Sequence, residues 1–193
     1  MLDVGCGDGA LVERLRALGF DAIGIDTRES ATPHCSQVSI EDYVADEPFD
    51  AVVARLSLHH TAHLGAVFER MRALLIDGGT FVMQEFSWAA LSPQMVSWVR
   101  SHADGPGPEP HTVDLWNATQ AEIGRRWITR YGELHSRDAM LFAADAFFTR
   151  RELVAVPYVS WLIDRPELVD AERAALVERR FPPLGFLYVG QAV

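Results

Sequence analysis

The chain contains no lysine, and all 17 of its basic residues are arginine. Catalysis through a lysine Schiff base is therefore excluded. The two cysteines, Cys6 and Cys35, are too few for a disulfide framework and are typical of a reducing cytosol. No apolar run approaches the roughly 20 residues that cross a bilayer, and the first residues lack the order of a signal peptide. We therefore expect a cytoplasmic protein without a membrane partner.

Positive charge is scarce as well. The 27 acidic residues outnumber the 17 basic ones and give a net charge of -10. Such a surface repels phosphate backbones, so no nucleic-acid partner is expected. Hydrophobic residues make up 49% of the 193-residue chain, which is enough to bury one ordinary core and argues against disorder.

The first half of the chain alternates short apolar runs with helical patterns, which favours βα units on a parallel sheet. The strands are expected at residues 1–4, 22–26, 37–40, 50–56 and 80–86. Apolar stripes predict helices over 11–18 and 64–75, the second ending at the turn Asp77-Gly78-Gly79.

The second half is richer in helical patterns. Helices are expected near 93–102, 113–131, 137–147 and 168–180, a loop at 104–110, and strands at 152–161 and 186–193. The fold class predicted is α/β, a Rossmann-like, doubly wound, mostly parallel sheet with a helical section inserted before the last strands. We expect a single domain over 1–193, with a nucleotide-binding half at 1–88 and a helical section plus the final strands at 89–193.

A glycine-rich turn, Gly5-Cys6-Gly7-Asp8-Gly9, joins the first strand to the first helix. Glycine lets the backbone turn tightly and approach a ligand, and the helix N-terminus offers unpaired N–H groups. Asp26, at the end of the second strand, is placed to accept both hydroxyl groups of a ribose. The dinucleotide pattern G-x-G-x-x-G is not present, which disfavours a nicotinamide oxidoreductase.

The string Leu2-Asp3-Val4-Gly5-Cys6-Gly7-Asp8-Gly9 closely resembles motif I of the class I S-adenosylmethionine (SAM) dependent methyltransferases. Further segments resemble landmarks of that family in the same order: Gly24-Ile25-Asp26, Ile40-Glu41-Asp42, Phe49-Asp50-Ala51-Val52-Val53 leading to Leu58-His59-His60, and Leu74-Leu75-Ile76-Asp77-Gly78-Gly79. The resemblance extends from Met1 to about Phe86. It implies SAM as the cofactor.

The resemblance also implies a set of cofactor-binding residues. The motif I loop would pass under the methionine part of SAM, and the residues after the second, third and fourth strands would hold its ribose, its adenine and the floor below its sulfonium. In chain order these residues are Asp3 (amino group), Gly5, Cys6, Gly7, Asp8, Gly9, Asp26 (ribose), Thr27, Ile40 and Glu41 (adenine), and Arg55 and Leu56 (floor).

Class I domains usually carry a segment before motif I that closes over SAM. This chain begins inside the first strand. Three explanations are open: the start was misassigned, the chain is truncated, or the segment is genuinely absent. Its loss is expected to open the cofactor cleft to water.

Methyl transfer from a sulfonium depends largely on alignment, and a base is needed only where the acceptor must lose a proton early. His59 and His60 follow the fourth strand and are the catalytic candidates, although one of them could instead pack or cap the next helix. His59 and His63 have a helical metal spacing, but no carboxylate or cysteine completes a set, so no metal is expected.

Four residues are candidates for contact with the acceptor: Glu85, Trp88, Tyr131 and His135. Helix capping is the alternative for Glu85 and core packing for Trp88. The sequence thus predicts SAM-dependent methyl transfer to a small organic molecule at O, N or C. The alternative is a SAM-binding protein of this fold that does not catalyse or is degenerate.

Overall fold

The computed structural model describes residues 1–102, 116 and 118–193. Its strands are β1 (Leu2–Val4), β2 (Ile23–Asp26), β3 (Cys35–Gln37), β4 (Phe49–Arg55), β5 (Leu75–Phe86), β6 (Phe148–Val156) and β7 (Gly185–Ala192). Its α-helices are α1 (Ala10–Ala17), α2 (Leu64–Ala73), α3 (Pro93–His102), α5 (Gln120–Tyr131), α6 (Arg137–Asp145), α7 (Val159–Leu162) and α8 (Val169–Val177). Short 3-10 turns are η1 (Leu58–His60), η2 (Trp88–Ala90) and η3 (Pro166–Leu168).

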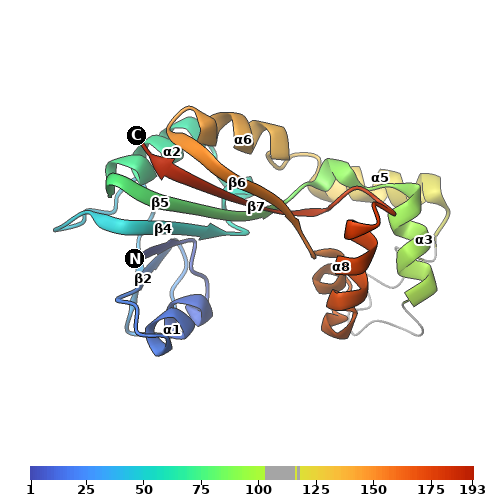
Figure 1. Cartoon of the computed structure of the whole chain (residues 1–193), viewed down its shortest axis with the longest axis horizontal. Helices are drawn as coiled ribbons and strands as arrows, with labels where there is room; N and C mark the ends of the chain where they lie inside the picture. The colour runs from blue at the N-terminus through green and yellow to red at the C-terminus, as the bar shows by residue number, and fades with distance from the viewer. Residues whose placement is uncertain (103–115, 117) are drawn as a thin grey trace. The chain divides into compact units, whose positions relative to one another are not determined.

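The strands form one seven-stranded sheet in the order β3-β2-β1-β4-β5-β7-β6, which confirms the predicted fold class. The pairs β1–β2, β2–β3, β1–β4 and β4–β5 are parallel. Helix α1 covers one face, and α2 and α6 cover the other (Figure 1). The strand order reverses between β1 and β4, and open α/β sheets bind ligands beyond the carboxyl ends of strands at such a point.

Buried apolar side chains from α2 and the neighbouring strands hold this part of the sheet. The predicted stripe of α2 is buried, with Phe68 fully enclosed. Phe81 of β5 stacks on Phe148 of β6 with 4.6 Å between ring centroids, and Phe68 meets Phe81 edge-on at 5.6 Å. These rings fix α2 against the strands and so place the β4–α2 connection.

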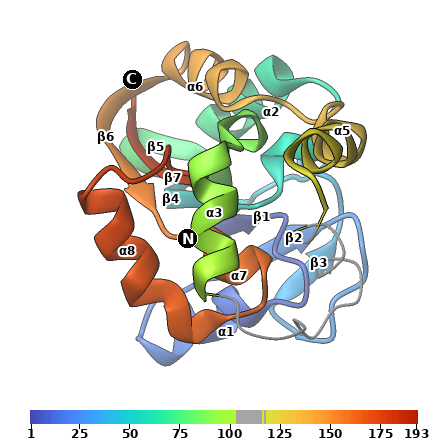
Figure 2. The same ribbon diagram turned by 90° about the vertical axis from the view of Figure 1, so that its right-hand side faces the viewer.

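The chain divides into two compact units. The first comprises 1–85, 138–153 and 187–193, and the second 86–137 and 154–186. Helices α3, α5, α7 and α8, which are labelled in Figure 2, belong to the second unit. Its core includes Trp98 and Trp127, both buried. Among the residues described, no helix has the length and apolarity to cross a membrane.

One strand and one turn predicted in the first half were misplaced. The strand expected at 37–40 is wrong, because β3 occupies Cys35–Gln37 and its pairing with β2 ends where Val38 N–H donates to the Asp26 carbonyl at 2.8 Å. The turn expected at 77–79 lies inside β5. Gly78 takes a φ of 73° there, and the pairing with β4 is irregular over the same stretch. The two glycines therefore lie in an irregular part of the strand rather than in a turn before it.

The strand expected at 152–161 was also wrong in part, because β6 ends at Val156 and α7 follows at Val159–Leu162. The buried carboxylate of Glu172 accepts the backbone N–H groups of residues 158–160 and turns the chain there. Helix α5 begins at Gln120, where the Thr119 side chain accepts from Glu122 N–H at 3.3 Å. The expected loop at 104–110 and the helix start at 113 lie outside the described residues.

Candidate functional site

Glycines shape the loop between β1 and α1. Gly5, Gly7 and Gly9 have φ values of 78°, 56° and 79°, a region that other residues rarely adopt. A Cβ on Gly5 would lie 2.3 Å from Cβ of Ser57, so no larger residue fits. The Gly5 N–H donates to the Ile25 carbonyl at 2.8 Å. The loop is therefore fastened to the end of β2.

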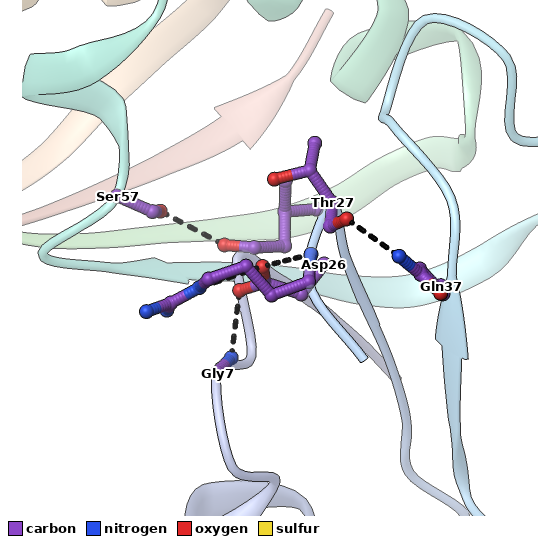
Figure 3. A network of polar contacts seen from close by, with 7 residues as sticks. Gly7, Asp26, Thr27, Gln37 and Ser57 are labelled. Carbon is purple, nitrogen blue, oxygen red and sulfur yellow. Dashed lines mark hydrogen bonds and ion pairs between the residues drawn. The ribbon is translucent and has the colours of Figure 1, made fainter. Parts of the chain in front are cut away.

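Asp26 links the end of β2 to this loop (Figure 3). Its Oδ2 accepts the Gly7 N–H at 2.8 Å, and its Oδ1 accepts the Arg28 N–H at 2.8 Å with Arg28 Nε at 3.3 Å. Burial opposes ionisation, but the N–H groups of Arg28 and Gly7 outweigh it and lower the pKa of Asp26. A carboxylate has about four acceptor positions, so this ionised group can still receive ribose hydroxyls.

Asp3, on β1, has a buried oxygen without a partner. The side chain is 3% exposed, and its Oδ1 makes no hydrogen bond. Burial raises the pKa of Asp3 to about 6, against the opposing charge of Arg55. A buried polar atom usually finds a partner, and an ammonium group would satisfy this one. The orphaned oxygen therefore fits the amino group of SAM.

Cys6 and Asp8 are the two residues of the loop that carry side chains. Cys6 is buried, and a Cβ on Gly24 would lie 2.7 Å from its sulfur. Asp8 is exposed and accepts the Ala10 N–H at 3.1 Å through Oδ1, where α1 begins. Neither residue lines the cavity described next, and of the predicted set Asp3, Gly7, Gly9 and Arg55 do not line it either.

A cavity of about 420 Å³ opens beside Asp26. Sites for small molecules commonly measure about 300–1,000 Å³. The residues of the predicted set that line it are Gly5, Asp26, Thr27, Ile40, Glu41, Leu56 and His60. Further lining residues that were not predicted include Arg28, Val38, Ser39, Ser57 and Thr61. The cavity lies beyond β1, β2 and β4, as the strand order requires.

The backbone bends sharply at the end of β4. Leu56 has a φ of 52°, which is uncommon for a residue with a side chain, and its N–H donates to the Gln84 carbonyl at 2.9 Å. Strain of this kind gathers at functional sites. The bend places Leu56 on the cavity wall, while Arg55, half-buried, acts on the Asp3 carboxylate.

The two histidines of η1 differ in their surroundings. His60 is exposed and lines the cavity. His59 is buried, and its Nδ1 lies 2.6 Å from Oε2 of Glu85. Glu85 is fully buried and accepts the Leu58 N–H at 2.7 Å through its other oxygen. Because both of its oxygens are already used in this way, Glu85 is better placed to hold His59 than to contact an acceptor directly.

The other three acceptor-side candidates belong to the second unit. Trp88 donates through Nε1 to the Leu134 carbonyl at 3.1 Å. Tyr131 is half-buried and contacts Phe86 edge-on, with the ring centroids 5.6 Å apart. His135, four positions later in the chain, is also half-buried. The cavity lining described above includes none of the three.

Arg28 and Ser57 are the lining residues with a readable sequence signal. Arg28 stands two positions after the predicted ribose acid, and Ser57 directly precedes the histidine turn. Ser57 also donates to the Val4 carbonyl at 2.9 Å (Figure 3), so it joins the ends of β1 and β4.

Residues 1–128 match the sequence model of a family described as a methyltransferase domain. The ubiquinone biosynthesis O-methyltransferase of Nitrobacter winogradskyi is 33% identical over 92 residues, covering 41% of this chain and 35% of that protein. An uncharacterized methyltransferase of Mycobacterium tuberculosis is 33% identical over 116 residues, covering 51% of this chain and 58% of that protein. The chain therefore spans only part of the length of these curated relatives.

Solved structures share the fold at low sequence identity. The N-methyltransferase NodS of Bradyrhizobium japonicum, in complex with S-adenosyl-L-homocysteine (SAH), is 15% identical with a TM-score of 0.58, over 99% of this chain and 76% of that one. The 1,6-didemethyltoxoflavin-N1-methyltransferase of Burkholderia thailandensis, with its substrate and SAH bound, is 17% identical with a TM-score of 0.58, over 100% and 70%.

Proposed function

Because the chain belongs to the methyltransferase domain family, we propose that it transfers a methyl group to a small organic molecule. The family match confirms the resemblance seen in motif I, and SAM is the cofactor. SAM supplies a methyl group that is bonded to a positively charged sulfur. After transfer of the methyl group, the remainder of the cofactor leaves as a neutral thioether. What the chain must provide is a site that holds SAM and the acceptor in line and excludes water.

The proposal rests mainly on two acids next to the glycine loop, Asp26 and Asp3. Asp26 is held ionised on the cavity wall, and the Asp3 oxygen is buried without a partner. We assign Asp26 to the ribose hydroxyls and Asp3 to the amino group. Gly5, Gly7 and Gly9 keep the loop low enough for the methionine part to pass.

The adenine and sulfonium sides follow from the remaining lining. Thr27, Ile40 and Glu41 line the cavity together, and Ile40 is 7% exposed, so it offers an apolar surface for the adenine ring. Arg55 and Leu56, at the end of β4, would form the floor below the sulfonium. Cys6 and Asp8 act by supporting the loop that carries these contacts.

The acceptor is proposed to be a small molecule with a hydroxyl group. The curated relatives named O-methyltransferases favour oxygen, and a fold neighbour has 1,6-didemethyltoxoflavin bound together with SAH. His59 and His60 remain the catalytic candidates, and Trp88, Tyr131 and His135 the acceptor-side ones. The net charge of -10 favours neither nucleic acid nor anionic membrane as a partner. We propose a cytoplasmic location, and we propose that both compact units of residues 1–193 belong to one methyltransferase domain.

The experiment is a turnover screen. Purified protein is incubated with methyl-labelled SAM and a panel of catechols, other phenols, alcohols and amines, and SAH release and labelled product are measured. Transfer to a hydroxyl acceptor supports the proposal. A chain that binds SAH yet transfers no label to any acceptor supports the alternative, a SAM-binding protein without catalysis.

Asp3 gives the site a dependence on pH. In the free protein its pKa is raised to about 6, so the carboxyl is protonated below that pH and cannot pair with an ammonium group. A bound amino group favours the charged carboxylate and lowers its pKa, so SAH affinity should fall below pH 6, by up to about tenfold per pH unit. Calorimetric titrations of SAH at pH 7.5 and 5.0 measure the change.

The same linkage acts on stability with the opposite sign. The folded pKa of Asp3 lies above its unfolded value, so the free protein loses the corresponding stability as pH rises from about 4 to 6.

The variant Asp3→Asn tests the role of Asp3 in binding. It should bind SAH more weakly than the wild type at pH 7.5, and its SAH affinity should depend less on pH. An equal slope in wild type and Asp3→Asn would remove Asp3 from the amino-group site.

A further inference from the structure

The carboxylate of Glu85 is enclosed at the end of β5. The side chain is fully buried, and both oxygens are used by η1: Oε1 accepts the Leu58 N–H at 2.7 Å, and Oε2 lies 2.6 Å from His59 Nδ1. Burying a carboxylate is costly unless charged or polar partners compensate. The contacts of Glu85 therefore concentrate on one turn of three residues.

That turn carries the only histidine ring on the cavity wall described above. The rings of His59 and His60 are in contact, with centroids 4.2 Å apart and an angle of 47° between their planes. His59 is 7% exposed, whereas His60 lines the cavity. A continuous series of contacts thus runs from Glu85 through His59 to His60.

Charges around His60 favour its neutral form. Partial desolvation at the cavity wall and the neighbouring His59 lower the pKa of His60, Arg28 lowers it further, and Glu85 opposes them. These three residues are the charged or titratable groups acting on the ring from η1, β5 and the end of β2. At neutral pH His60 therefore has an unprotonated ring nitrogen, as a proton acceptor needs.

We propose that Glu85 is a positioning residue that fixes His59 and the turn behind His60, so that His60 accepts the proton of a hydroxyl acceptor. The inference rests on the proposed function and assigns different roles to the two histidines. The acceptor O–H bond breaks and its proton passes to His60, while the oxygen lone pair forms the bond to the methyl carbon. The carbon–sulfur bond breaks with its electron pair on sulfur, and the His60 imidazolium returns its proton to solvent.

The first test is an NMR titration of the His60 ring. In the wild type its midpoint should lie below the ordinary value for histidine. His59→Gln removes the neighbouring ring that lowers the pKa of His60, so the midpoint should move upward. The matched control is His63→Gln, three residues further on and exposed, which should leave the midpoint unchanged.

The second test is Glu85→Gln, which keeps the shape of the side chain and an acceptor for Leu58 N–H. The low-field proton resonance expected for His59 Nδ1–H should be present in the wild type and lost in this variant. Turnover of a catechol probe should fall tenfold or more with SAH affinity unchanged. Glu69→Gln, which removes an exposed acid from α2, is the control and should match the wild type.

A wild-type His60 that titrates at or above the ordinary value, or that ignores His59→Gln, overturns the inference. So does a Glu85→Gln variant that retains the low-field resonance. Because the NMR results require neither SAH binding nor an accepted catechol, they decide the positioning role separately. Failure of wild-type SAH binding would instead count against the proposed function.

Discussion

Replacing His60 by glutamine is expected to slow methyl transfer to a hydroxyl acceptor by roughly 10²–10⁴-fold, the usual contribution of a general base. Glutamine keeps a polar side chain of similar reach but cannot take up a proton. His60 lines the cavity, and partial desolvation there and the neighbouring His59 favour its neutral form, so its loss removes the proton acceptor. SAH release with the best phenol of the screen measures the effect.

The same variant should retain most of its affinity for SAH, because Asp26, Asp3 and the glycine loop are unchanged. His63→Gln serves as the control and should turn over like the wild type, since His63 is exposed and its side chain makes no cap on α2. Wild-type turnover in His60→Gln would show that the acceptor loses its proton without this residue.

The largest loss of stability is expected from Glu172→Ala in the second unit. Glu172 is fully buried and accepts four hydrogen bonds, from the N–H groups of Tyr158, Val159 and Ser160 at 2.8 Å each and from the Ser160 hydroxyl at 2.7 Å. Alanine would remove the acceptor of all four hydrogen bonds. The free energy of unfolding should fall by about 3–5 kcal/mol.

Urea denaturation measures this loss. Glu172→Gln keeps one acceptor oxygen and should fall between Glu172→Ala and the wild type. Glu178→Ala, which removes only a surface ion pair with Arg180, should cost about 1 kcal/mol or less. Equal unfolding midpoints for Glu172→Ala and Glu178→Ala would refute the structural role given to the buried carboxylate.

Local patterns explain how much of the fold was predictable. Short local sequence patterns determine the glycine loop, the acid at Asp26 and the apolar face of α2, and each was found where expected. Two glycines at 78 and 79 resemble a turn in the same local way. There the prediction was wrong, because β5 continues through both glycines and its pairing with β4 resumes at Thr80 after a register shift.

Contacts between distant segments explain what sequence could not supply. Glu85 and His59 are 26 positions apart and meet only because β4 and β5 are neighbours in the sheet. Glu172 likewise meets residues 158–160 through folding of the intervening chain. Arg28 is close to Asp26 in sequence, but its guanidinium contact depends on a side-chain orientation that no motif specifies.

Calorimetric titration of SAH into the wild type and Asp26→Ala tests the cofactor site most directly. We expect wild-type binding on the order of micromolar and a loss of about tenfold to a hundredfold in Asp26→Ala, the value of charge-assisted hydrogen bonds to the ribose. Asp21→Ala removes an exposed acid paired with Arg16 and should bind like the wild type. Absence of SAH binding by the folded wild type, or equal affinity in Asp26→Ala, would contradict the account.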